Sequence, residues 1–189
     1  TLSSSSAASD VYKRQDVLLR RGASEVVAVD VGYGQLVWRL QNDDRVKVLD
    51  RTNIRHLTPE LMDGPADLMV GDLSFISLEL VLPAIAECMS DGADLLPMVK
   101  PQFEVGKDRL GSGGVVRSPE LREEVTLDVA RKALELGLSC RAATASPLPG
   151  PSGNVEYFLW LVRDGGASAP GDDELARMIH RAVEEGPVN

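Results

Sequence analysis

The segment Leu95–Gly106 constrains the fold most, because it joins an apolar run to a loop at a single lysine. Its first five residues, Leu95–Val99, are typical of a buried parallel strand, and Pro101 disfavours a helical conformation at the residue before it. Lys100 is therefore expected at the carboxyl end of a strand. In open α/β sheets the ligand crevice lies outside these ends, so Lys100 is a candidate functional residue. The alternative is a lysine whose stem covers apolar surface while its ammonium reaches solvent.

Three acidic residues follow other strand-like runs in the same way. Asp30, Asp50 and Asp72 each close a strand-like run, which is β-branched before Asp30, and helical patterns alternate with these runs. This alternation predicts an α/β fold with a doubly wound, mostly parallel sheet. Since the carboxyl ends of parallel strands meet at one edge, Asp30, Asp72 and Lys100 are expected along that edge. An acid in the position of Asp30 can accept hydrogen bonds from both hydroxyls of a ribose.

Glu156 lies near the start of the last strongly apolar run, which extends to Val162. An acid at the entry to such a strand is costly to bury unless it is paired. Glu156 can reach the edge that carries Lys100 only if the last strand runs antiparallel to its neighbours. We therefore expect an antiparallel last strand.

The glycine-rich loop between Phe103 and Arg117 carries three basic residues, Lys107, Arg109 and Arg117. Basic groups on a flexible loop suit the phosphates of a nucleic-acid backbone. The alternative is a mobile loop that is merely solvated. The glycines do not form a P-loop, because no Gly-Lys-Ser/Thr sequence opens the following helix.

Composition restricts the class of protein. The chain has 189 residues, of which 43% are hydrophobic and 26% charged, and no apolar run approaches the roughly 20 residues of a membrane helix. Its two cysteines, Cys88 and Cys140, lie far apart in apolar surroundings, which indicates buried core residues in a reducing cytoplasm and no metal site. The net charge of −9 argues against a large nucleic-acid surface on this chain.

The chain divides into three segments. Residues 1–15 have no clear helical or strand period, and they are interpreted as a non-native or disordered leader. Residues 16–164 carry the α/β pattern. Residues 165–189 are expected to form a linker and a short amphipathic tail helix.

Five segments together resemble the TlyA (hemolysin A) family of FtsJ-like RNA 2′-O-methyltransferases. They occur in order along the chain: Val29–Leu36, Asp50–Leu57, Asp72–Leu78, Val99–Gly106 and Gly153–Tyr157. The resemblance covers nearly everything from Asp16 to about Arg163. It implies a Rossmann-like methyltransferase sheet, which differs from a dehydrogenase sheet in its antiparallel strand.

The resemblance also implies roles for individual residues. Asp72, Lys100 and Glu156 match the last three members of the family's Lys-Asp-Lys-Glu catalytic set. The cofactor would be S-adenosylmethionine and the partner ribosomal RNA or a ribosomal subunit. The expected cofactor-binding residues are Asp30 at the ribose, Asp50 and Arg51 near the adenine, Val31 and Gly32 in the adjoining loop, and Asp72.

The chain departs from the family pattern at its amino end. The small basic RNA-binding domain, the first catalytic lysine, and the first strand with its glycine-rich loop have no counterpart in the sequence. We therefore expect a sheet with its first strand missing, and a truncated chain with impaired activity. The basic part of the family's proteins would be the part that is absent, which would account for the acidic net charge.

Two other functions remain open at the level of sequence. Asp30 would also suit the ribose of NAD in a Rossmann oxidoreductase, although no second nucleotide-binding half is identifiable. A non-catalytic RNA-binding or hemolysin-like module is the other alternative, although the tail helix is short and rich in acids.

Overall fold

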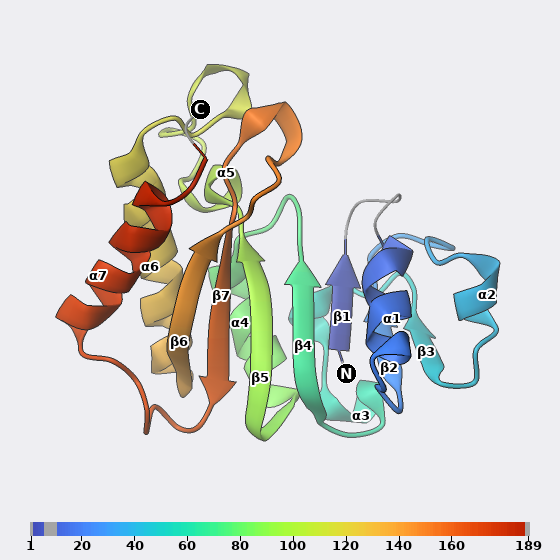
Figure 1. Ribbon diagram of the computed structural model, residues 1–189. Coiled ribbons are helices and arrows are strands. Elements are labelled where there is room, and N and C mark those ends of the chain that lie inside the picture. The colour runs from blue at the N-terminus through green and yellow to red at the C-terminus, as the bar shows by residue number, and fades with distance from the viewer. Residues whose placement is uncertain (1, 6–10, 188–189) are drawn as a thin grey trace.

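A computed structural model describes residues 2–5 and 11–187 of the chain. Within these residues, seven strands form one sheet in the order β3-β2-β1-β4-β5-β7-β6 (Figure 1). The strands are β1 (Leu2–Ser5), β2 (Val26–Val29), β3 (Val46–Leu49), β4 (Ala66–Asp72), β5 (Met89–Val99), β6 (Leu138–Ala145) and β7 (Tyr157–Arg163). β7 runs antiparallel to β5 and β6, whereas the other pairs are parallel. The predicted mostly parallel sheet with an antiparallel last strand is confirmed.

Helices cover both faces of the sheet. They are α1 (Val11–Arg20), α2 (Trp38–Gln41), α3 (Pro59–Met62), α4 (Leu78–Glu87), α5 (Pro101–Glu104), α6 (Pro119–Glu135) and α7 (Asp172–Glu184), with 3₁₀ turns η1 (Ile54–His56), η2 (Ser112–Gly114) and η3 (Pro151–Gly153). α1 lies in front of β1 and β2 in Figure 1, and α4 and α6 lie behind the sheet. No helix in the described ranges is long and apolar enough to cross a membrane.

The structure corrects the expectation that the first strand is missing. β1 lies between β2 and β4 and is parallel to both, with Leu2 paired to Val27 on one side and to Met69 on the other. An empty position here would leave unpaired N–H and C=O groups on two neighbouring strands inside the sheet, which is costly. The expected leader boundary at residue 15 also differs from the structure, because α1 begins at Val11.

The carboxyl ends of the parallel strands lie along one edge of the sheet, the carboxyl edge. The register between β4 and β5 determines which residues lie side by side there. Near this edge Gly71 pairs with Pro97, so Asp72 ends β4 close to where Lys100 leaves β5. At the opposite end the register shifts: Ala66 pairs with Met89, but Leu68 pairs with Asp94. The extra residues of β5 form a bulge at the end far from Lys100.

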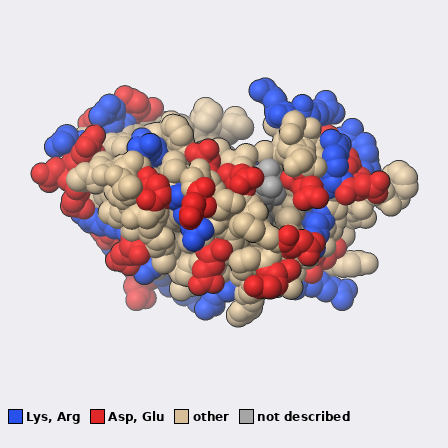
Figure 2. Space-filling view, turned by 90° about the horizontal axis from the view of Figure 1, so that it is seen from below, with Lys and Arg blue, Asp and Glu red and all other residues tan. Residues whose placement is uncertain are grey.

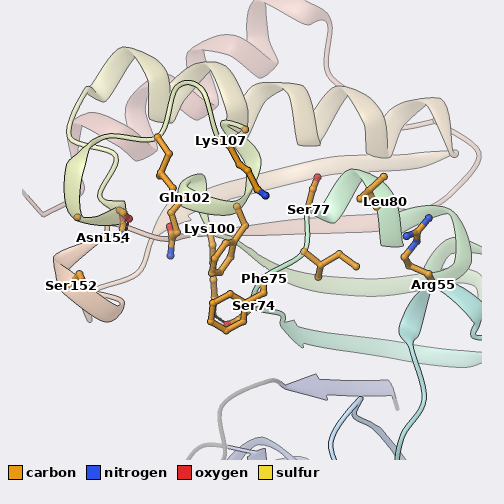
Figure 3. Close-up of a pocket in the computed structure, with 16 residues that line it drawn as sticks. Arg55, Ser74, Phe75, Ser77, Leu80, Lys100, Gln102, Lys107, Ser152 and Asn154 are labelled. Carbon is orange, nitrogen blue, oxygen red and sulfur yellow. Dashed lines mark hydrogen bonds between the residues drawn. The ribbon is translucent and has the colours of Figure 1, made fainter.

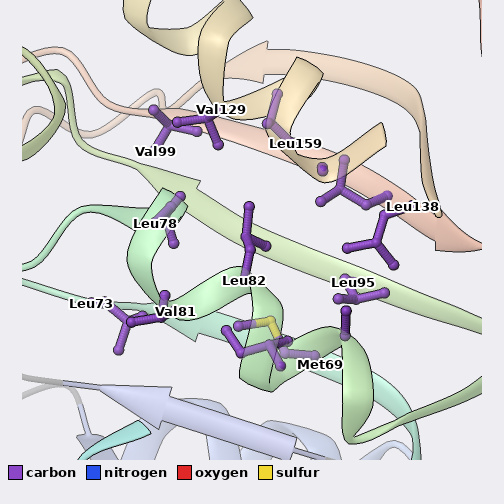
Figure 4. Packing of buried hydrophobic residues seen from close by; sticks show 14 of the residues in the cluster. Met69, Leu73, Leu78, Val81, Leu82, Leu95, Val99, Val129, Leu138 and Leu159 are labelled. Atoms are coloured by element: carbon purple, nitrogen blue, oxygen red, sulfur yellow. The ribbon is translucent and has the colours of Figure 1, made fainter. Parts of the chain in front are cut away.

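The main hydrophobic core lies between the sheet and the helices α4 and α6 (Figure 4). Leu82, Leu95 and Leu159 are fully buried there. Each such side chain contributes about 1.5–3 kcal/mol through burial. β2 separates two hydrophobic clusters. Val27 and Val29 face the main core, whereas Val26 and Ala28 belong to the cluster that contains Leu19 of α1.

The segment expected to be a tail helix packs into this core. Leu175 and Ile179 of α7 are buried in the same cluster as the residues of β6 and β7. α7 lies beside α6 and the edge strand β6 (Figure 1). It is therefore part of the domain.

Candidate active site

Three predicted residues meet at the carboxyl edge. The Nζ atom of Lys100 lies 2.5 Å from Oδ1 of Asp72 and 3.9 Å from Oε1 of Glu156. Asp72 and Lys100 come from neighbouring parallel strands, and Glu156 reaches them because β7 runs in the opposite direction. Their exposed fractions are 9%, 7% and 5% for Asp72, Lys100 and Glu156, so solvent screens these ion pairs little.

Two further side chains complete the surroundings of Lys100 and Asp72. Lys100 donates a hydrogen bond of 2.9 Å to the hydroxyl oxygen of Ser74. The second carboxylate oxygen of Asp72 forms an ion pair with Arg14 of α1. Arg14 lies in the segment that the sequence interpretation excluded from the fold, so its position at the site is a correction.

Glu156 is held by contacts of its own. Nε2 of Gln102 donates a 3.2 Å hydrogen bond to Oε1 of Glu156. Burial raises the pKa of the Glu156 carboxyl above its ordinary value, and the Lys100 ammonium and the Gln102 amide oppose this shift. The backbone of Gly150 approaches so closely that a Cβ atom there would lie 2.4 Å from Oε1 of Glu156.

A cavity of about 930 Å³ opens beside Lys100 (Figure 3). Lys100 and Gln102 are among its polar lining residues, and the rings of Phe75 and Phe103 contact each other with centroids 5.2 Å apart. Phe75 is 88% exposed and has φ of +64°, a conformation that is strained for a phenylalanine. Such an exposed aromatic ring beside a polar floor can stack against a planar ligand.

Arg55 and Lys107 line the same cavity and add positive charge to that of Lys100. Of the three predicted nucleic-acid contacts, only Lys107 lines this cavity among the described residues. Arg109 pairs with Glu124 and donates a 3.1 Å hydrogen bond to the carbonyl of Val105, so its guanidinium is held against α6. Arg117 is exposed in the segment that leads into α6.

A second, smaller cavity of about 300 Å³ lies at the end of β2. Asp30 lines it, and its Oδ1 accepts a 2.7 Å hydrogen bond from the N–H of Gly32. The other carboxylate oxygen, Oδ2, is buried and has no hydrogen-bond partner among the residues that the structure describes. Burial raises the pKa of Asp30, the bond from Gly32 lowers it, and the charge of Asp50 raises it further.

Of the other residues predicted to bind the cofactor, Val31 differs from Asp50 and Arg51 in its position relative to this smaller cavity. Val31 lines it, whereas Asp50 and Arg51 do not, within the described part of the chain. Asp50 instead accepts a 2.9 Å hydrogen bond from the N–H of Gly34, and the guanidinium of Arg51 lies 4.6 Å from the ring centroid of Tyr33. Both residues thus contact the loop after β2 and, within the ranges described, do not contact the smaller cavity itself.

The two cavities share the wall formed by residues 74–76, which follow Asp72. A ligand in the smaller cavity and one in the larger cavity would therefore lie on either side of these residues, of which Ser74 is bonded to Lys100. Sequence reasoning missed Ser74, Gln102 and Phe103 as site residues. Each lies two or three residues beyond a predicted strand end, so following the chain past each end into its loop could have found them.

No group of three or more His, Cys, Asp and Glu side chains in the ranges 2–5 and 11–187 is arranged to hold a metal ion. Cys88 and Cys140 are both free and buried.

Residues 15–163 match the family described as FtsJ-like methyltransferase. The chain belongs to this family. It is 60% identical over 174 residues to the 16S/23S rRNA (cytidine-2′-O)-methyltransferase TlyA of Mycobacterium tuberculosis, a match that covers 91% of this chain and 64% of that protein. The resemblance noted in the sequence is thereby confirmed, and the family is one of methyltransferases, not oxidoreductases.

Solved structures agree with this assignment. A structure from Streptococcus thermophilus described as a hemolysin matches with a TM-score of 0.85 and 34% identity, covering 97% of this chain and 66% of that one. An S-adenosylmethionine-dependent methyltransferase from Methanosarcina mazei matches with a TM-score of 0.59 and 11% identity, covering 86% and 91%. The second match shows that the fold is that of a Rossmann-like methyltransferase.

Proposed function

We propose that the protein transfers a methyl group from S-adenosylmethionine to a ribose 2′-hydroxyl of ribosomal RNA. The observation that carries the proposal is the convergence of Asp72 and Glu156 on Lys100, which lines a cavity, in a chain of the FtsJ-like methyltransferase family. The chain spans 64% of the length of TlyA of M. tuberculosis, whose name gives cytidine 2′-O-methylation of 16S and 23S rRNA. A cytidine in rRNA is accordingly the proposed target, and the cytoplasm the proposed location.

The smaller cavity fits the cofactor. Within the described ranges, Oδ2 of Asp30 is a buried acceptor without a hydrogen-bond partner, and a ribose presents hydroxyl donors that would satisfy it. Val31 would lie beside the bound nucleoside, with Asp50 and Arg51 holding the loop after β2 in place. When bound, S-adenosylmethionine supplies a methyl group that its sulfonium has already activated toward nucleophiles.

The protein's own residues then act on the ribose hydroxyl, which is a poor nucleophile until it is oriented and loses its proton. Lys100 lines the larger cavity, where its Nζ can orient the hydroxyl oxygen. Once the ammonium has given a proton to solvent, the neutral amine can accept the proton of the hydroxyl. Asp72 and Ser74 hold Nζ in place from two sides. Glu156 positions the hydroxyl from the third side.

The larger cavity fits the RNA. Its volume is within the usual range of about 300–1,000 Å³ for ligand sites, and Arg55 and Lys107 carry positive charge where a phosphate would approach. On the opposite side of the molecule, at the amino ends of the parallel strands, acidic and basic side chains are interspersed (Figure 2). RNA is therefore expected to approach the carboxyl edge.

The test replaces Lys100 by alanine. Incorporation of tritiated methyl groups into rRNA should fall at least about 100-fold, as removal of a group that handles the proton does. Binding of S-adenosylhomocysteine, measured by calorimetry, should be unchanged, because Lys100 does not line the smaller cavity within the described residues.

The matched control is Lys132→Ala, which removes a lysine on the outer side of α6 that pairs only with Glu135 of the same helix among the ion pairs described. This control should methylate at the wild-type rate. Unchanged turnover in Lys100→Ala would refute the role of Lys100. A wild-type protein that binds rRNA but transfers no methyl group would favour a non-catalytic RNA-binding module.

A further inference from the structure

The larger cavity has two walls that come from different parts of the chain. The loop between β4 and α4 forms one wall with Ser74 and Phe75, and the turn after β5 forms the other with Lys100, Gln102 and Phe103 (Figure 3). Lys100 is bonded across to Ser74, so the geometry at its Nζ depends on how the two walls are held together.

Glu104, the last residue of α5, connects these walls. Its Oε2 accepts a 2.6 Å hydrogen bond from the hydroxyl of Ser77, and its Oε1 accepts a 2.9 Å hydrogen bond from the N–H of Leu78. Ser77 is the N-cap of α4 and Leu78 is its first residue. A residue four positions after Lys100 thus fixes the start of the helix that follows Phe75.

This position suits a charged carboxylate. The first N–H groups of a helix lack intrahelical partners, and the helix dipole favours negative charge there. Burial nevertheless raises the pKa of Glu104, while its bonds to Ser77 and Leu78 lower it. The carboxylate is withdrawn from water at a cost that these two bonds between the walls partly offset.

Two other contacts join the same walls, but both involve side chains that face the cavity. They are the hydrogen bond from Lys100 to Ser74 and the contact between the Phe75 and Phe103 rings. A substrate in the cavity competes with both. Glu104 and Leu78 do not line the cavity within the described residues, whereas Ser77 does. The bond between Glu104 and the N–H of Leu78 therefore persists when substrate enters.

We propose that Glu104 is a positioning residue for methyl transfer, which fixes the separation between Lys100 and the loop that carries Ser74 and Phe75. The inference rests on the proposed function. The strained φ of Phe75 supports it, because a backbone in this conformation persists only where its surroundings hold it. Without the Glu104 bonds the loop is free to relax and carry Ser74 away from Lys100.

The first test is independent of activity. The protein contains three phenylalanines, so the full chain labelled with 4-fluorophenylalanine gives three fluorine resonances, which single Phe→Leu variants assign. Glu104→Ala should shift or broaden the resonances of Phe75 and Phe103. The resonance of Phe158 on β7 should stay in place.

The second test measures methyl transfer. In Glu104→Ala, kcat should fall about 10–100-fold, the scale of a displacement near 1 Å at a reacting group. KM for S-adenosylmethionine should not change. Glu104→Gln keeps an acceptor for the N–H of Leu78 and should recover part of the rate. Glu79→Ala, which removes an exposed acid from the first turn of the same helix, is the matched control and should behave as wild type.

The outcomes separate a positioning role from a simple helix cap. If Glu104→Ala lowers the melting temperature but leaves kcat and the fluorine resonances of Phe75 and Phe103 unchanged, the proposal is wrong. If the wild-type protein transfers no methyl group, the proposed function fails. In that case the fluorine test still decides whether Glu104 holds the two walls together. Resonances of Phe75 and Phe103 that do not change in Glu104→Ala would overturn this connection, and resonances that shift or broaden would support it.

Discussion

Replacing Gly150 by alanine tests whether Glu156 must occupy its observed position. The new methyl carbon would lie 2.4 Å from Oε1 of Glu156 and 2.6 Å from its Cδ, whereas ordinary contact begins at 3.4 Å. The carboxylate must therefore move by about 1 Å, the difference between 3.4 and 2.4 Å. Its 3.2 Å hydrogen bond from Gln102 would be lost or rebuilt, because little room for lengthening remains below the 3.5 Å limit of such bonds.

A displacement of this size at a reacting group lowers the rate by up to about 100-fold. Gly150 does not have a positive φ, so alanine introduces no backbone strain and the variant should fold. The assay is methyl transfer to rRNA at saturating S-adenosylmethionine, with thermal unfolding measured in parallel. Leu148→Ala, which truncates an exposed side chain in the same loop, is the control. A Gly150→Ala protein with wild-type kcat would show that the position of Glu156 does not limit the reaction.

Two further predictions concern Asp30 and Asp164. Asp30→Ala should weaken S-adenosylhomocysteine binding about 10–100-fold in calorimetry, since a hydrogen bond to a charged group contributes about 1.5–3 kcal/mol; affinity within twofold of wild type would exclude the ribose assignment. Hydrogen bonds from the hydroxyls of Ser139 and Ser168 lower the pKa of Asp164 from 3.8 to about 2. The folded pKa lies below the unfolded one, so this stabilisation is fully present above pH 3.8 and is lost as the pH falls through about 2. Asp164→Asn should therefore melt at a lower temperature than the wild type at neutral pH. In scanning calorimetry this difference in melting temperature should shrink as the pH falls from 3.8 to about 2. A difference that stays constant would contradict the stabilising role of the ionised Asp164.

The sequence predicted the fold and the centre of the site through one rule. Apolar runs that end in Asp30, Asp72 and Lys100 predicted a parallel sheet whose carboxyl ends share an edge, and the structure places Asp72 and Lys100 in contact there. The same reasoning required β7 to be antiparallel if Glu156 was to join them, which the strand pairing confirms.

The remaining site residues could not be predicted because their roles depend on contacts across the chain. Glu104 and Ser77 are 27 residues apart, and only the folded walls reveal that they bond. Gly150 has no sequence signal that separates it from other loop glycines, because its importance comes from the atom it faces. Arg14 and β1 were missed since the segment has no period, whereas pairing on both sides determines its conformation.

The bulge at the start of β5 determines where this protein tolerates changes in chain length. Between Met89 and Asp94 the strand already contains more residues than the facing stretch of β4, and the ladder resumes its regular pairing before Pro97. Insertions or deletions of one residue there can be absorbed locally, whereas the same change beyond Leu95 would turn Lys100 away from Asp72. Evolution and engineering can thus vary the length of β5 near its amino end without moving Lys100 at its carboxyl end.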